Sequence, residues 1–198
     1  MKSFKKIAVT VLAAVMMLLM STTVFAANSP VKSSFNASLA KKTVTYNAKK
    51  QKPKVVVKDA KGKKISSKYY KVTYNKKGLK DAGTYKVTVT GKGKYAGYKQ
   101  VLTYKIKAKS QKVTIKKDSF STTKKAVKKK SKSVGTIKAK VKKGAKVTYT
   151  TNNTKIKVSK NGKITVAKGT RKGIYQVKVT VKVKNYKTVN KYVKVTVK

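Results

Sequence analysis

Apolar and polar residues alternate along most of the chain after residue 26. The alternation covers residues 85–90, 102–107 and 147–150, and its longest run is 175–184. Val, Ile, Tyr and Thr fill most of these positions, and a period of two with such residues is typical of strands that bury one face. We find no sustained helical spacing of apolar residues after residue 26. The pattern therefore predicts an all-β protein.

Turn-forming residues separate these alternating segments. They lie at 59–62, 81–83, 91–93 and 161–162. The dipeptide Asn161-Gly162 stands between two alternating segments, which predicts a hairpin with a two-residue turn. Short strands separated by such turns favour a β-sandwich of the immunoglobulin type.

The chain also contains an internal repeat. In residues 83–89 a Gly, a Tyr and two Val occupy every second position, and residues 173–179 repeat this order. We therefore expect two tandem immunoglobulin-like β-sandwich domains, covering residues 27–108 and 109–198. Each is large enough for a small sandwich with a thin core.

Residues 1–26 have a different pattern. Lys2, Lys5 and Lys6 precede the apolar run 7–20, and Val24 and Ala26 are the small residues at the −3 and −1 positions of a cleavage site before Ala27. This order is typical of a cleaved secretory signal peptide, and the run is shorter than the roughly 20 residues of a membrane span. The alternative is an uncleaved N-terminal anchor. We expect a secreted or extracellular protein, retained at the cell wall, without membrane insertion after signal removal.

The amino-acid composition excludes several classes of catalytic and metal-binding site. The 198 residues include 54 Lys plus Arg and only 3 acids, a formal charge of +51, and there is no Glu, His, Cys or Trp. Without His or Cys, the usual nucleophile systems, zinc fingers and disulfides are excluded. The acids Asp59, Asp81 and Asp118 are scattered, which disfavours paired-carboxylate catalysis and calcium binding. The sequence predicts a protein that is not an enzyme, with no catalytic residues, no metal and no cofactor.

Lysines dominate two parts of the sequence. A dense run in a loop leading into a strand and a spaced set on the strand 175–184 form the candidate polyanion-binding residues: Lys124, Lys125, Lys128, Lys129, Lys130, Lys132, Lys178, Lys182 and Lys184. The alternative interpretation is that lysines on exposed strands only prevent edge-to-edge aggregation, and that the run is a solvated loop.

The expected partners are anionic cell-wall polymers such as teichoic acid, or acidic glycans, held by many weak contacts. Nucleic acid is another partner, bound without sequence specificity because phosphate contacts need only cations and Arg171 is the only arginine. Tyr69, Tyr70, Tyr95 and Tyr98 could stack on bases, but we expect most of them in the core or at its rim. The sequence carries no signal for an oligomeric state.

Both halves resemble known bacterial surface modules. Residues 45–47, 52–57, 70–74 and 82–97 resemble the immunoglobulin-like repeats of Clostridia-type surface proteins, with a turn similar to GKGNYTG at 91–97. Residues 147–153 and 155–166 resemble group 2 bacterial immunoglobulin-like domains, with Tyr149 at the usual aromatic position. Lysine replaces the acids common in those families. The resemblance implies spacer or adhesive modules.

The sequence thus predicts a secreted or surface-retained, non-catalytic cationic protein that binds anionic polymers in an adhesive or structural role. The alternative function is that of a secreted antimicrobial or nucleic-acid-binding protein.

Overall fold

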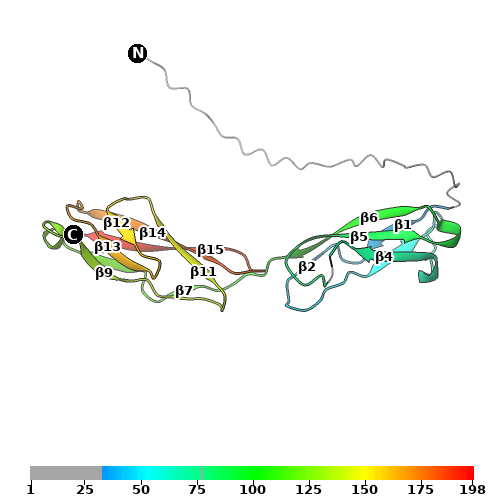
Figure 1. Ribbon diagram of the computed structural model, residues 1–198, viewed down its shortest axis with the longest axis horizontal. Helices are drawn as coiled ribbons and strands as arrows, with labels where there is room; N and C mark the ends of the chain where they lie inside the picture. Colours follow the sequence, from blue (N-terminus) through cyan, green and yellow to red (C-terminus); the bar gives the residue numbers. More distant parts are fainter. Residues whose placement is uncertain (1–32, 77) are drawn as a thin grey trace, which may run out of the picture. The chain divides into compact units, whose positions relative to one another are not determined.

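The computed structural model describes residues 33–76 and 78–198 (Figure 1). The signal peptide predicted for residues 1–26 lies outside the described residues. Within them the chain forms β-strands and three short 3-10 helices, with no α-helix. No helix in this part is long and apolar enough to cross a membrane. The predicted all-β class is confirmed.

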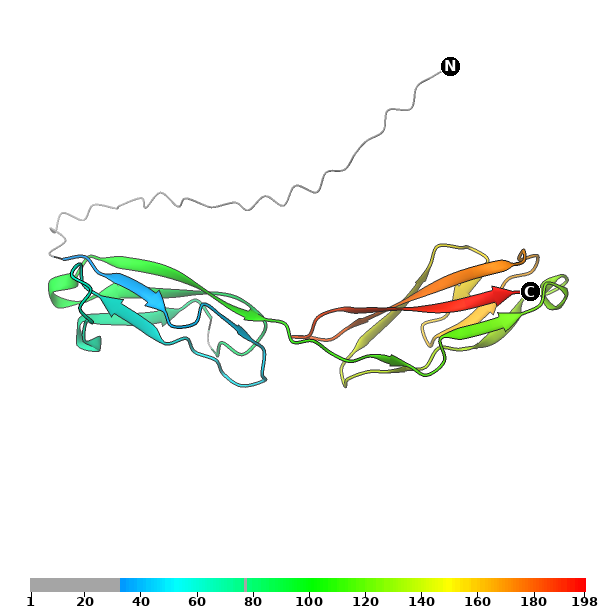
Figure 2. The ribbon, with the colours of Figure 1, turned by 180° about the vertical axis from the view of Figure 1, so that it is seen from behind.

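The first group of strands builds a sandwich of two sheets (Figures 1 and 2). The larger sheet has the order β2-β6-β5-β4, and β1 pairs with β3 in the smaller one. The elements are β1 (Asn36–Leu39), β2 (Thr43–Thr45), β3 (Val55–Lys58), η1 (Ser67–Tyr69), β4 (Tyr70–Tyr74), β5 (Gly83–Gly91), η2 (Gly93–Tyr95) and β6 (Lys99–Lys107).

The second group of strands builds a similar sandwich. One sheet has the order β11-β14-β15-β8, a second has the order β12-β13-β9, and β10 pairs with β7. The elements are β7 (Thr114–Ile115), β8 (Ser119–Thr122), η3 (Lys125–Val127), β9 (Lys132–Thr136), β10 (Ala139–Lys140), β11 (Lys146–Thr151), β12 (Ile156–Val158), β13 (Lys163–Val166), β14 (Gly173–Lys182) and β15 (Val189–Val197).

The alternation of the long strands sets which side chains enter the cores. On β14 the odd-numbered Val177, Val179 and Val181 are fully buried. On β15 the fully buried Val193 pairs with Val177, and the fully buried Val195 pairs with Tyr175. On β5 the buried residues are Tyr85, Val87 and Val89. The cores of residues 35–106 and of residues 113–197 are separate clusters. Removing this apolar surface from water drives the fold.

The repeated Gly-x-Tyr motif has the same role in both sandwiches. The Tyr85 hydroxyl donates to the carbonyl of Asp81 at 2.5 Å, and the Tyr175 hydroxyl donates to the carbonyl of Arg171 at 2.9 Å. A tyrosine near the start of a long strand that bonds a carbonyl just upstream is a feature of immunoglobulin folds. These observations confirm the immunoglobulin-like sandwich.

The described residues belong to one compact unit. All pairings between named strands stay within β1–β6 or within β7–β15. An isolated bridge between Lys109 and Tyr186 lies where the chain passes from one group to the next. The domain ranges 27–108 and 109–198 stay a prediction.

The hairpin expected at Asn161-Gly162 exists, but its turn is longer than predicted. Strand β12 ends at Val158 and β13 begins at Lys163, and the N–H of Ser159 donates to the carbonyl of Lys163 at 3.0 Å. Gly162 has a φ of 81°. The pair Ser159/Lys163 thus closes a three-residue loop whose last position needs the left-handed conformation that glycine supplies. The prediction of a two-residue turn was wrong for this reason.

Candidate polyanion-binding surfaces

The dense lysine run is a structured turn. Its six lysines, Lys124, Lys125, Lys128, Lys129, Lys130 and Lys132, are all exposed. Val127, in their midst, is fully buried in the core of the second sandwich and ends the helix η3. The carbonyl of Val127 also accepts a hydrogen bond from the N–H of Gly169 at 2.9 Å. One buried side chain therefore holds the run against the sandwich while its lysines face solvent.

The fold brings two distant lysines to this run. The N–H of Lys124 donates to the carbonyl of Lys198 at 2.7 Å, and the N–H of Lys168 donates to the Ser131 hydroxyl at 3.1 Å. Figures 1 and 2 both show the end of β15 beside the turn that follows β8. Both added lysines are exposed. We call the eight residues the end cluster: Lys124, Lys125, Lys128, Lys129, Lys130, Lys132, Lys168 and Lys198.

Sequence reasoning missed Lys168 and Lys198. They are isolated lysines far along the chain from the run, and only long-range backbone hydrogen bonds bring them close. No local spacing carries that information.

Lys178 and Lys182 share the outer face of the sheet β11-β14-β15-β8, as the alternation predicts. Lys182 lies opposite Lys146 of β11, and Lys194 of β15 lies opposite Gln176, next along the same face. Lys178 is half-buried and the other three lysines are exposed. Threonines fill the positions between them. We call this surface the lysine–threonine face: Lys146, Lys178, Lys182, Lys194, Thr148, Thr150 and Thr180.

The lysine–threonine face extends away from the end cluster. Gly173 pairs with Val197 at the end of β14 that lies near the cluster, whereas Lys182 is at the other end of the strand. At about 3.3 Å per residue, Lys182 lies about 30 Å along the strand from Gly173. The predicted lysines therefore divide between two surfaces.

Lys184 belongs to neither surface. Strand β14 ends at Lys182, and Asn185 has a positive φ of 69° that turns the chain. The Lys184 ammonium lies 2.8 Å from a carboxylate oxygen of Asp81 and forms the one ion pair of the described residues. The predicted strand extends to Lys184, and the turn at Asn185 is the reason that it stops earlier.

The pair is reinforced by Asn185. Its side-chain amide donates to the other Asp81 oxygen at 2.8 Å, and its amide oxygen accepts from the N–H of Ala82 at 2.8 Å. The hydrogen bonds from Lys184 and Asn185 lower the pKa of Asp81, and Asp81 raises the pKa of Lys184. The Lys184 side chain is 78% exposed and the Asp81 side chain 46%, so water screens the attraction. Asp81 nevertheless compensates the charge of Lys184, whereas no ion pair in the described residues compensates the charge of the other candidate lysines.

The tyrosines expected at the core or its rim lie there. Tyr95 is buried, and Tyr69, Tyr70 and Tyr98 are partly buried against the same cluster. The ammonium groups of Lys68 and Lys94 lie 5.0 and 5.5 Å from the ring centroid of Tyr69. These rings are packing residues, as predicted.

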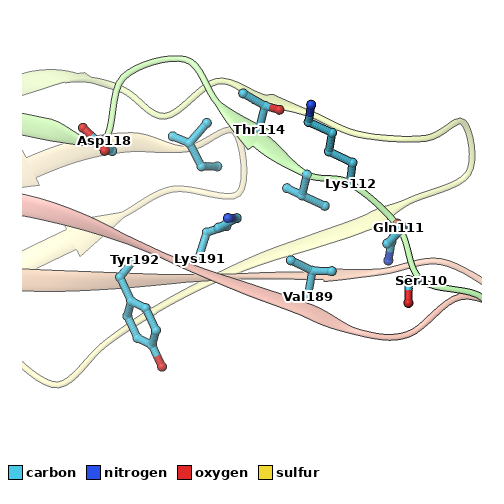
Figure 3. Close-up of a pocket in the computed structure, with 10 residues that line it drawn as sticks. Ser110, Gln111, Lys112, Thr114, Asp118, Val189, Lys191 and Tyr192 are labelled. Carbon is cyan, nitrogen blue, oxygen red and sulfur yellow. The ribbon is translucent and has the colours of Figure 1, made fainter.

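A groove of about 750 Å³ opens between the segment before β8 and the strand β15 (Figure 3). Its charged side chains are Lys112, Lys191 and Asp118. In the described residues no three His, Cys, Asp or Glu side chains come together. The groove has one carboxylate and therefore lacks the pair that general acid–base hydrolysis of glycosides uses.

No family model and no curated protein matches the chain. Solved structures that resemble it include Drosophila N-cadherin EC1-4, at 10% identity and a TM-score of 0.37, over 84% of this chain and 51% of that one. Immunoglobulin domains 1–5 of Sidekick-1 match at 10% identity and 0.36, over 82% and 39%, and the tandem Ig repeats of Dlar at 11% and 0.31, over 84% and 98%. The chain spans about half the length of the N-cadherin structure. The fold assignment rests on the strand topology described above.

Proposed function

We propose that the protein is a secreted, surface-retained, non-catalytic immunoglobulin-like protein that binds anionic polymers. Teichoic acids and acidic glycans are the polymer classes, and the role is adhesive or structural. The proposal also places the two halves among the bacterial immunoglobulin-like modules that they resemble.

The observation that carries the proposal is the end cluster. Its eight lysines surround a structured turn, and no ion pair involves any of them in the part of the chain that the structure describes. A concentrated set of free ammonium groups creates a positive potential that attracts a polyanion and releases its counterions on binding. The lysine–threonine face adds a second set of cations.

The test is charge removal at matched positions. One variant carries Lys→Gln at Lys124, Lys125, Lys128, Lys129, Lys130 and Lys132. Its control carries the same number of Lys→Gln changes at exposed lysines of the first sandwich: Lys41, Lys49, Lys50, Lys61, Lys63 and Lys64.

At about 0.15 M salt, we expect the first variant to bind heparin and purified teichoic acid about tenfold or more weakly, because several phosphate or sulfate contacts are lost together. We expect the control to lose much less affinity. Equal losses would contradict the role of the end cluster, and an unmodified protein that binds neither polymer would contradict the function.

The alternative, a secreted antimicrobial or nucleic-acid-binding protein, uses the same charge. Stronger binding to duplex DNA than to both polymers at equal salt, or killing of bacterial cells, would favour it.

A further inference from the structure

Tyr192 stands out on the outer face of the second sandwich. Its side chain is 58% exposed, although it belongs to a long strand with a fully buried neighbour at Val193. Tyr192 is among the residues that line the groove, and Figure 3 shows its ring on the side of β15 opposite Lys191. The ring therefore stands over the lysine–threonine face.

No lysine ammonium lies over the exposed Tyr192 ring, unlike several buried or partly buried rings of the described residues. Lysine ammonium groups lie 5.0 to 5.9 Å from the centroids of five other rings: Tyr69, Tyr74, Tyr95, Phe120 and Tyr186. Across the described residues, no lysine, no second ring and no hydrogen bond to its hydroxyl engages Tyr192. The ring is open to a ligand.

A lysine stands directly beside the ring. Lys178 of β14 is the cross-strand partner of Tyr192. The N–H of Lys194 points to the other side of β15, where it donates to the carbonyl of Asp118 at 2.8 Å. The direction of the backbone N–H repeats every second residue along a strand, so the N–H of Tyr192 also points away from β14. Tyr192 and Lys178 are therefore a non-hydrogen-bonded pair, in which the Cα atoms lie only about 4.5 Å apart.

Further polar groups border the ring on the same face. Lys194 follows Tyr192 at the next outward position of β15, and Thr150 of β11 lies beyond Lys178. In the other direction the Thr180 hydroxyl donates to the side-chain oxygen of Asn190 at 2.9 Å. The Asn190 amide N–H groups remain as donors. An aromatic platform is thus surrounded by ammonium, hydroxyl and amide groups.

The platform is also rigid. Val177, Val179 and Val193 lie under it on the inner face and are fully buried. Every residue of β15 pairs with a residue of β14. A ligand that lands on this face does not have to order it, and a preorganised site loses less free energy on binding.

We propose that the face around Tyr192 binds the sugar rings of an acidic polysaccharide. This inference rests on the proposed function and selects one polymer class within it. The negative face of an aromatic ring attracts the weakly positive C–H groups of a sugar. Lys178 and Lys194 pair with its sulfate or carboxylate groups, and Thr150 and Asn190 bond its hydroxyls.

The single ring favours a glycan over single-stranded nucleic acid. Proteins that bind single strands stack successive bases on several aromatic side chains. The other exposed large apolar side chain on this face is Ile174, which offers no ring. A polymer without rings, such as polyphosphate, would use the lysines alone.

The experiment compares Tyr192→Ala with Tyr192→Phe, which keeps the ring. Ile174→Ala is the matched control, because Ile174 is 68% exposed on the same face. Binding to heparin, polyphosphate and single-stranded DNA is measured by calorimetry at one salt concentration, and thermal unfolding checks that each variant is folded.

For heparin, we expect Tyr192→Ala to lower affinity about 5- to 30-fold, the lower part of the range that the loss of a base–aromatic stacking contact gives. Tyr192→Phe should keep most of the affinity, and Ile174→Ala should match the unmodified protein. Polyphosphate binding should stay unchanged in all variants.

An unchanged heparin affinity in Tyr192→Ala, while the unmodified protein binds heparin, overturns this inference and leaves the proposed function standing. An equal loss on polyphosphate, or a larger loss on single-stranded DNA, also overturns it. If the unmodified protein does not bind heparin, this inference is overturned, and if it binds neither heparin nor teichoic acid, the proposed function fails as well.

Discussion

Gly91 shows how closely the backbone approaches itself at the end of β5. A Cβ atom at this position would lie 1.9 Å from the carbonyl oxygen of Tyr95. The 3-10 turn η2 folds back here, and the N–H of Gly91 donates to the carbonyl of Tyr98 at 2.8 Å. Glycine is required because no side chain fits between the two backbone segments.

We predict that Gly91→Ala destabilises the protein by about 1–3 kcal/mol, the usual cost of forcing extra atoms into a packed site. Gly83→Ala is the control, because its Cβ would meet nothing closer than 4.0 Å. Urea unfolding measures both. Equal stability of the two variants would contradict the close approach.

The Asp81–Lys184 pair predicts a pH dependence with a definite sign. The folded pKa of Asp81 is lowered, so its contribution to stability is present above the unfolded pKa and is lost as pH falls through the folded pKa. The raised pKa of Lys184 gives the mirror behaviour: its contribution is lost as pH rises through the folded pKa.

We expect Asp81→Asn to reduce the fall in Tm that the unmodified protein shows in acid at low salt. Lys184→Gln should also weaken it, because the ammonium is the first cause of the lowered Asp81 pKa. Thermal scans from neutral to acidic pH measure the effect. A Tm that falls with pH in the Asp81→Asn variant as steeply as in the unmodified protein would contradict the pairing.

At the scale of the elements, the period-two pattern predicts faces but not partners. It places Lys178 and Lys182 on one side of β14 correctly because alternation is local. It does not indicate that Lys146 and Lys194 join them, since the register with β11 and β15 depends on long-range pairing. The period-two pattern also does not predict the parallel pairing of β2 with β6 or of β8 with β15. The short strands β7 and β10 are too brief to show a period.

The Lys146/Lys182 pair lowers the stability of the sheet but supplies cations for polyanion binding. Like charges directly opposite on neighbouring strands destabilise a sheet. We predict that Lys146→Glu stabilises the protein by about 0.2–1 kcal/mol through a new cross-strand pair. The same change should weaken heparin binding, because it removes a cation and adds an anion. Thermal unfolding and calorimetry on one sample test both, and a variant that binds heparin equally well would contradict the role of this face.

At the scale of the whole molecule, the formal charge of +51 is carried by a chain that folds into sheets and turns. In the part of the chain that the structure describes, the apolar residues that alternate with lysine fill the interiors of the two sandwiches, so these lysines lie on folded sheets and turns. With one ion pair among the described residues, attraction between side chains contributes little to folding. The lysines are therefore available to an external polyanion.

The salt dependence of heparin binding tests this account most directly. The logarithm of the binding constant should fall linearly with the logarithm of salt concentration. With about four or more lysine contacts, affinity should drop at least about a thousandfold over a tenfold rise in salt. A binding constant that stays the same over that range would contradict electrostatic binding by the lysine surfaces.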